Sequence, residues 1–177
     1  MAEIDITTNS TSNHMFPVKS SIWEIDGYIA YLRLRNGVAV VGVSDLPLLE
    51  DFEWYVGNRN YLVRTDATGA LFAHRIIMSP RDKEIVDHID GNGLNNKRSN
   101  LRICTHAENM RNRKIASHNK SGYKGVYKDN KKNRWRAEIC FNKKRYRLGS
   151  FGSAISAALA YDKAAISLHG EFARTNF

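Results

Sequence analysis

The stretch Glu84–Lys114 reads EIVDHIDGNGLNNKRSNLRICTHAENMRNRK, and it decides the fold of the middle of this 177-residue chain. Ile85–Asp90 is β-branched and ends in charged residues, which predicts a short strand. Leu101–Cys104 predicts a second strand, and Gly91–Asn100 is a long polar loop between the two. The expected order begins strand, loop, strand.

A helix is expected after the second strand. Thr105 precedes Glu108 by three residues, which is the spacing of a capping box, in which each side chain bonds to the other residue's backbone N–H. The helix should therefore run from about residue 106 to residue 114.

Polar residues of this segment suit metal-assisted hydrolysis of a phosphodiester. Asp87 and Asn109 offer a carboxylate and an amide oxygen, which are the ligands that a hard divalent cation prefers. His88 titrates near neutral pH and can accept a proton from water. Asn100, at the end of the loop, is placed to hold the imidazole by its second nitrogen. Asn112 is the alternative ligand if the helix register differs.

The segment resembles the HNH endonucleases, which have a ββα-metal fold, and among them the phage homing endonucleases most. The matching residues are Val86–Asn92, Asn95–Asn96, Ser99–Arg102 and Glu108–Asn112. The resemblance implies that Asp87 and Asn109 bind the metal. It also implies that His88 is the general base and that Asn100 orients it. The family often has His where this chain has Asn109, and asparagine favours Mg²⁺ or Mn²⁺. No structural zinc is expected, because the chain has no Cys-x-x-Cys pair.

The last third of the chain predicts a three-stranded antiparallel sheet backed by one helix. The strand-like runs are Tyr123–Lys128, Arg134–Phe141 and Lys144–Gly149. Ser153–His169 has small and apolar residues at three- and four-residue spacing, which predicts a helix lying close on the sheet, with Gly170 at its C′ position.

This region resembles the DNA-binding domain of plant ethylene-response factors, the Apetala type. The matching residues are Gly122–Val126, Trp135–Ile139, Leu148–Phe151, Ala157–Ala165 and Asn176–Phe177. The resemblance implies that the sheet enters the major groove of double-stranded DNA while the helix packs behind it. The residues expected at or near DNA are Lys124, Arg134, Trp135, Arg136, Arg145 and Arg147. The plant domains usually carry Arg at Tyr127 and Cys140, so their base preference is not transferred to this chain.

The distribution of charge supports a nucleic-acid partner. Residues 1–80 hold 6 basic and 9 acidic residues, whereas residues 81–177 hold 21 basic and 9 acidic ones. Cations near the expected nuclease site are assigned to the DNA backbone: Lys97, Arg98, Arg102, Arg111 and Arg113. The longest apolar run, Val38–Val43, is too short to cross a membrane.

The first eighty residues predict a small β-rich unit. Strands are expected at residues 23–25, 28–34 and 38–43, and a strand pair at residues 55–56 and 61–65. A short helix is expected at residues 46–52, and residues 71–78 fit strand or helix. His74 is read as a structural residue on a packed element.

The expected fold class is α+β, with a β-rich N-terminal unit, a ββα-metal core and the sheet–helix module. The boundaries are a flexible N-terminus (1–20), a platform (21–80), the nuclease core (81–114), a linker (115–121) and the DNA-binding domain (122–177). Without the C-terminal module, the core is expected to retain weak chemistry.

The expected function is that of a site-directed, metal-dependent DNA endonuclease, phage-encoded or bacterial and cytoplasmic. One catalytic constellation per chain favours a monomer that nicks DNA, with a dimer as the alternative. Two other functions remain open: a non-enzymatic DNA-binding regulator with a relict HNH fold, and a structure-specific or RNA nuclease.

Overall fold

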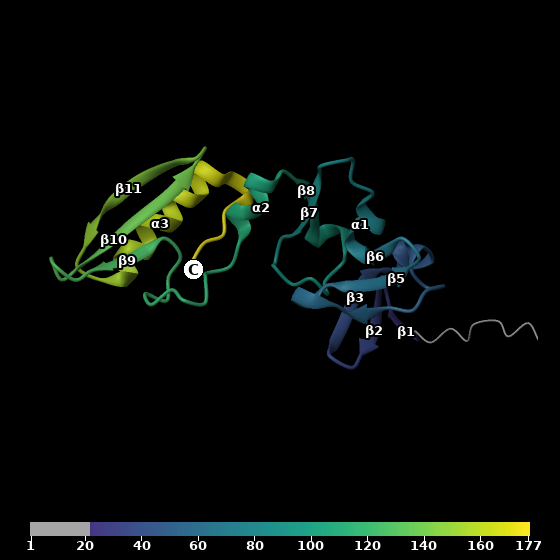
Figure 1. Ribbon diagram of the computed structural model, residues 1–177. Coiled ribbons are helices and arrows are strands. Elements are labelled where there is room, and N and C mark those ends of the chain that lie inside the picture. Colours follow the sequence, from purple (N-terminus) through teal and green to yellow (C-terminus); the bar gives the residue numbers. More distant parts are fainter. Residues whose placement is uncertain (1–21) are drawn as a thin grey trace, which may run out of the picture.

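A computed structural model describes residues 22–177, which form a mixed α+β fold with two lobes (Figure 1). One lobe contains strands β1 to β8 and helix α1, and the other contains β9 to β11 and helix α3. Helix α2 lies between them, near the C-terminal end of α3 (Figure 1). The expected α+β class is confirmed, whereas the predicted flexible terminus lies outside the described residues.

The first strands form an antiparallel sheet in the order β1-β2-β3, as the sequence predicts. They are β1 (Trp23–Asp26), β2 (Ile29–Leu34) and β3 (Gly37–Gly42). The helix predicted at residues 46–52 is wrong, because a 3-10 helix, η1 (Val43–Leu48), stands there and contains Pro47. Proline lacks the N–H that a continuing α-helix needs, so the turn ends soon after it.

A second small sheet confirms the predicted strand pair and adds one strand. It consists of β4 (Tyr55–Val56), β5 (Leu62–Asp66) and β6 (Gly69–Phe72), with a 3-10 turn, η2 (Asn58–Asn60), between the first two strands. The segment at 71–78 is divided between the end of β6 and helix α1 (Ala73–Met78).

The middle segment folds in the predicted order. Strands β7 (Ile85–His88) and β8 (Leu101–Cys104) pair antiparallel. The 3-10 turn η3 (Arg98–Asn100) leads into β8, and α2 (His106–Asn112) follows it. The capping box between Thr105 and Glu108 is present, and the helix ends two residues earlier than predicted.

The N-terminal unit and the ββα segment share one hydrophobic core, which includes Leu32, Leu62, Val86 and Leu101. The loop between β7 and β8 also pairs with β3, since the Val40 N–H donates to the Leu94 carbonyl (2.8 Å) and the Asn96 N–H donates to the Val40 carbonyl (2.7 Å). The residues on either side of the boundary predicted at residue 80 therefore fold around the same hydrophobic core.

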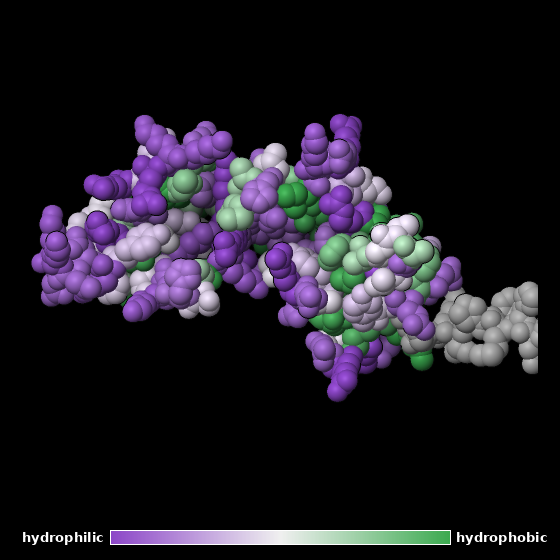
Figure 2. Space-filling model, viewed as in Figure 1, coloured by the Kyte–Doolittle hydropathy of each residue, from purple (hydrophilic) through white to green (hydrophobic). Residues whose placement is uncertain are grey.

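The C-terminal module is a sheet in the order β11-β10-β9, backed by one helix. Its elements are β9 (Val126–Asp129), β10 (Arg134–Phe141), β11 (Lys144–Phe151), α3 (Ala154–His169) and the 3-10 turn η4 (Gly170–Phe172). Alanines of α3 pack against alternate residues of β9 and β10 in its core. Hydrophilic residues cover much of the visible surface of this lobe (Figure 2).

The two lobes contact each other through α2 and the end of α3. The Lys124 ammonium donates to the carbonyls of Arg111 (2.5 Å) and Arg113 (2.8 Å) at the C-terminal end of α2. The Arg102 guanidinium lies 4.1 Å from the centre of the Phe172 ring and donates to the Glu171 carbonyl. These contacts hold the C-terminal module against the ββα segment.

Within residues 22–177, no helix combines the length and the apolar character needed to cross a membrane.

Candidate active site

A cavity of about 570 Å³ lies between β7 and α2. Asp87 and His88 line it from the end of β7, and Asn109 and Asn112 line it from α2. Tyr61 of the N-terminal unit also lines the cavity. The structure thus brings together three of the four predicted site residues, together with the alternative ligand Asn112.

The Asp87 carboxylate is buried, and its two oxygens differ in their partners. Oδ2 accepts hydrogen bonds from the Arg102 guanidinium at 2.7 and 3.0 Å and from the Asn112 amide at 2.9 Å. Oδ1 accepts only the longer bond from Asn112, at 3.2 Å. Oδ1 is therefore the oxygen with lone pairs left for a cation.

The partner of the buried His88 ring is Asn96. Its Oδ1 lies 3.1 Å from His88 Nε2, while its Nδ2 donates to the Gly93 carbonyl at 3.4 Å. An amide oxygen only accepts hydrogen bonds, so His88 carries its proton on Nε2 and keeps the lone pair on Nδ1. Burial lowers the pKa of His88, against the opposing effect of the Asn96 hydrogen bond. The ring is thus held neutral, as a general base requires.

Asn100 does not hold the imidazole, which corrects the role predicted for it. Its amide nitrogen donates to Asp90 Oδ1 (3.0 Å) and the Asn95 carbonyl (2.8 Å), and its oxygen accepts from the Asp90 N–H (3.1 Å). Asn100 therefore closes the loop that carries Asn96. The sequence gives no sign of this role for Asn96, because its separation of eight positions from His88, across a loop, does not reveal the contact.

The structure separates the two candidate ligands on α2. The Asn112 amide nitrogen faces four oxygens: both carboxylate oxygens of Asp87 and the carbonyls of His88 (3.0 Å) and Ile89 (3.3 Å). Asn112 therefore fastens α2 to the end of β7. Asn109 is only partly buried, and its side-chain amide has no hydrogen-bond partner in the described part of the chain. This arrangement favours Asn109 as the ligand.

These donors fit a hard divalent cation. A carboxylate oxygen and an amide oxygen meet in a cavity large enough for several waters, which is how Mg²⁺ is usually held. Among residues 22–177, no cluster of three or more His, Cys, Asp or Glu side chains could hold a metal ion. An ion at this cavity would therefore depend on amide and water oxygens as well.

Aromatic rings from the N-terminal lobe pack against His88. The centre of the His74 ring lies 5.0 Å from that of His88, and Tyr61 lies 5.7 Å from His88 and 5.1 Å from His74. Burial, with a smaller contribution from the neighbouring His88, lowers the pKa of His74 to about 3. His74 is thus neutral and packed, which agrees with the structural role expected for it.

Several cations predicted to contact the DNA backbone have partners inside the protein. Arg98 pairs with Asp45 at 2.7 Å, and Arg102 is held between Asp87 and η4. Arg111 lies over the Phe141 ring at 5.0 Å. The clamp role is therefore withdrawn for Arg98 and Arg102. Arg113 lines the cavity and Lys97 is partly exposed, so both stay predictions.

Four predicted DNA-contacting arginines share the face of the sheet that points away from α3. On β10 the core residue Ala137 faces the helix, so Arg134 and Arg136 lie on the opposite face. On β11, Arg145 is paired with Cys140 and Arg147 with Glu138, which places both arginines on the same outer face. Both approach the Glu138 carboxylate, and their side chains are 76% and 82% exposed.

Two other residues predicted to contact DNA lie elsewhere. Trp135 packs into the sheet–helix core, with the Lys128 ammonium 4.8 Å from its ring centre. Lys124 is turned toward α2, and burial lowers the pKa of its ammonium to about 8. Lys124 joins the lobes and does not lie on the outer face of the sheet, which corrects the prediction from the family resemblance.

Comparisons with known proteins agree with this division of the chain. The pattern of the family described as HNH endonuclease matches residues 72–111, and that of the AP2 domain matches residues 121–171. A protein of Acanthamoeba polyphaga mimivirus, named as an uncharacterized HNH endonuclease, is 32% identical over 86% of this chain and 83% of its own length.

Two further relatives each match part of the chain. Protein 3.8 of Escherichia phage T7 is 36% identical over 50% of this chain and 73% of its own length. An ethylene-responsive transcription factor of Arabidopsis thaliana is 40% identical over 54% of this chain and 61% of its own length. No solved structure shows a significant match to the chain.

Proposed function

The chain belongs to the HNH endonuclease family and ends in an AP2 DNA-binding domain, and we propose that it is a site-directed endonuclease of double-stranded DNA. The observation that carries this proposal is that Asp87, His88 and Asn109 line one cavity. Two relatives come from a virus and a phage, which supports a viral or phage origin for the chain.

In the proposed reaction, Nδ1 of His88 accepts a proton from the attacking water. The water oxygen bonds to phosphorus, the bond to the 3′ oxygen breaks, and a second water protonates that oxygen. The products are a 5′-phosphate and a 3′-hydroxyl. Mg²⁺ or Mn²⁺, held by Asp87 and Asn109, would neutralise the charge that develops on the phosphate and the leaving oxygen.

Other residues of the site orient the reacting groups. Asn96 fixes the tautomer of His88, and Asn112 and Arg102 fix the Asp87 carboxylate. The sheet is proposed to place this centre on its target by entering the major groove with its outer arginines, as β-readers of DNA do. One cavity of this kind within residues 22–177 favours a monomer that nicks one strand.

Cleavage of supercoiled plasmid in Mg²⁺ tests the proposal. The chain should nick the plasmid, and EDTA should stop cleavage while leaving DNA binding intact. His88→Ala should bind DNA without cutting it. The matched control His106→Ala, whose side chain is exposed on α2 and does not line the cavity, should cut normally.

The outcomes separate the alternatives. Binding without cleavage by the unsubstituted chain would favour the DNA-binding regulator with a relict nuclease fold. Equal cleavage by His88→Ala would overturn the assignment of the base. Preference for branched DNA or RNA over linear duplex would favour the structure-specific or RNA nuclease, and linear product formed without a nicked intermediate would favour a dimer.

A further inference from the structure

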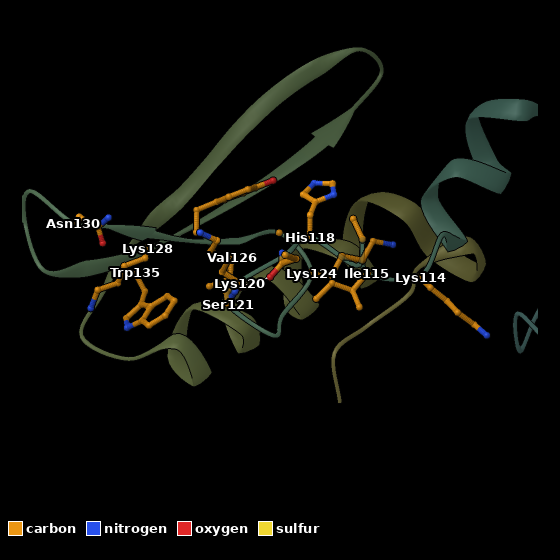
Figure 3. A pocket seen from close by; sticks show the side chains of 14 residues that line it. Lys114, Ile115, His118, Lys120, Ser121, Lys124, Val126, Lys128, Asn130 and Trp135 are labelled. Carbon is orange, nitrogen blue, oxygen red and sulfur yellow. Dashed lines mark hydrogen bonds between the residues drawn. The ribbon is translucent and has the colours of Figure 1, made fainter.

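A second cavity, of about 490 Å³, lies between the segment that joins the two lobes and strand β9. We call it the linker groove. Figure 3 shows its side chains spread along β9, from Lys114 at one end to Lys128 and Trp135 at the other. Four lysines line the groove (Lys114, Lys120, Lys124 and Lys128), and none of its lining residues is acidic. It is therefore a strongly cationic hollow outside the catalytic cavity.

Two of these lysines are free to meet a ligand. Lys124 donates to the backbone of α2, and Lys128 donates to Asn133 Oδ1 at 2.9 Å. Lys114 and Lys120 are exposed, and neither has a hydrogen-bond or ion-pair partner within the described residues. The protein thus leaves two ammonium groups beside the groove without internal compensation.

The linker groove and the catalytic cavity meet at Lys114, which lines both of them. The Lys114 stem lies beside the loop after β7, because a Cβ added to Gly91 would come within 2.8 Å of Lys114 Cε. Tyr127 also lines the groove and pairs with Arg136 across β9 and β10. Cationic positions therefore continue from the catalytic cavity to the DNA-facing side of the sheet.

We propose that the linker groove binds the sugar–phosphate backbone of the DNA strand between the scissile phosphate and the base pairs that the sheet contacts. The inference rests on the proposed function, because it takes DNA as the ligand of both lobes. Lysine ammonium groups suit phosphates as compact point charges, and the exposed apolar side chain of Ile115 suits deoxyribose. The groove would then fix the distance between the recognised sequence and the cut.

The test compares two double variants of the full-length chain. Lys114→Gln with Lys120→Gln removes the free charges of the groove. Lys83→Gln with Lys163→Gln removes the same charge from exposed lysines that line neither cavity. Fluorescence anisotropy measures binding to a labelled random-sequence 40-base-pair duplex in EDTA over a range of salt concentrations.

Each lost phosphate contact lowers the salt slope of binding by about 0.9, so the groove variant should lower it by about 1.8. Its affinity at 0.1 M salt should fall on the order of 10- to 100-fold, whereas the control variant should keep the slope of the unsubstituted chain. Equal slopes for the two variants would overturn the proposal.

This binding measurement is independent of catalysis, because EDTA removes the metal. If the unsubstituted chain binds DNA and fails to cut plasmid in Mg²⁺, the nuclease proposal fails while the groove is still tested by the slopes. If cleavage is normal and the two variants have equal slopes, the groove proposal fails alone.

Discussion

Asn96 is the residue that sets the tautomer of His88, the proposed base. It is fully buried, and its amide oxygen faces His88 Nε2 while its own backbone pairs with β3. Asn96 thus contacts the N-terminal sheet through its backbone and sets the tautomer of His88 through its side chain. Asn100, four residues later, acts on the loop only.

We expect Asn96→Ala to lower the rate of cleavage by about 10- to 100-fold, the usual effect of losing such a supporting contact. DNA affinity should not change, because Asn96 is buried away from DNA. Single-turnover cleavage and anisotropy measure the two quantities. Asn100→Ala serves as the comparison and should mainly lower the midpoint of thermal unfolding. A rate loss that is larger for Asn100→Ala would contradict the role of Asn96.

His74 makes stability depend on pH. Its pKa is lowered to about 3 in the folded chain, whereas an unfolded histidine titrates near 6.5. The unfolded state therefore binds more protons below pH 6.5, so the stabilisation present above that pH is lost as the pH falls toward 3.

Between pH 7.5 and pH 5, this linkage should cost the unsubstituted chain about 2 kcal/mol through His74. His74→Gln removes this titrating side chain. The unfolding free energy of the variant should therefore fall by about 2 kcal/mol less than that of the unsubstituted chain over the same pH interval. Urea denaturation at the two pH values measures both losses. Equal losses would show that His74 is not held neutral.

At the scale of elements, helix α2 is held in place at both ends, and it carries Asn109, the proposed metal ligand. The Thr105 side chain accepts from the Glu108 N–H (3.3 Å), and the Glu108 carboxylate accepts from the Thr105 N–H (2.8 Å). At the other end, Asn112 fastens the helix to β7 and Lys124 donates to its last carbonyls. With seven residues, α2 is too short to be stable by itself and depends on these contacts.

Thr105→Ala should therefore lower the free energy of unfolding by about 1 kcal/mol. Thr105→Ser keeps the hydroxyl group and should cost much less. Chemical denaturation of both variants measures the difference. A similar loss in both would assign the effect to the Thr105 methyl group.

At the scale of the whole molecule, the C-terminal module also supports the catalytic site. Arg102 binds the Asp87 carboxylate on one side and contacts Glu171 and Phe172 on the other. From the sequence, the core is expected to retain weak nuclease activity without the C-terminal module, which assumes that the two modules are independent. These contacts show that they are not independent.

We expect Phe172→Ala to slow cleavage about two- to fivefold, because a cation–π contact contributes about 0.5–1 kcal/mol to holding Arg102 in place. DNA affinity should stay the same, since Phe172 lies outside the sheet. Leu159→Ala, an exposed position on α3, is the control for a truncation in the same module. Affinity and rate falling together would instead indicate a general defect of the C-terminal module.

Local patterns explain which elements were predictable. The capping box, the β-branched runs of β2 and β3 and the strand-like run of β10 are signals between near neighbours, and the corresponding elements formed as expected. The α-helix expected at residues 46–52 did not form, because Pro47 lacks the N–H that a continuing α-helix needs. The sequence did not predict strand β6 as a separate element, because a strand and a helix follow each other directly within residues 69–78.

The sequence by itself determined the order of elements, the two modules and the candidate groups Asp87, His88 and Asn109, because these follow from local spacing and residue chemistry. Only the tertiary structure decided which groups touch. It placed Asn96 on His88, Asn112 on Asp87, and Arg102 and Lys124 between the lobes. These contacts join residues 8 to 69 positions apart, and their geometry depends on how the chain packs in three dimensions. The basic residues therefore have two kinds of role: Arg102 and Lys124 make contacts inside the protein, and the exposed arginines of the sheet are proposed to contact DNA.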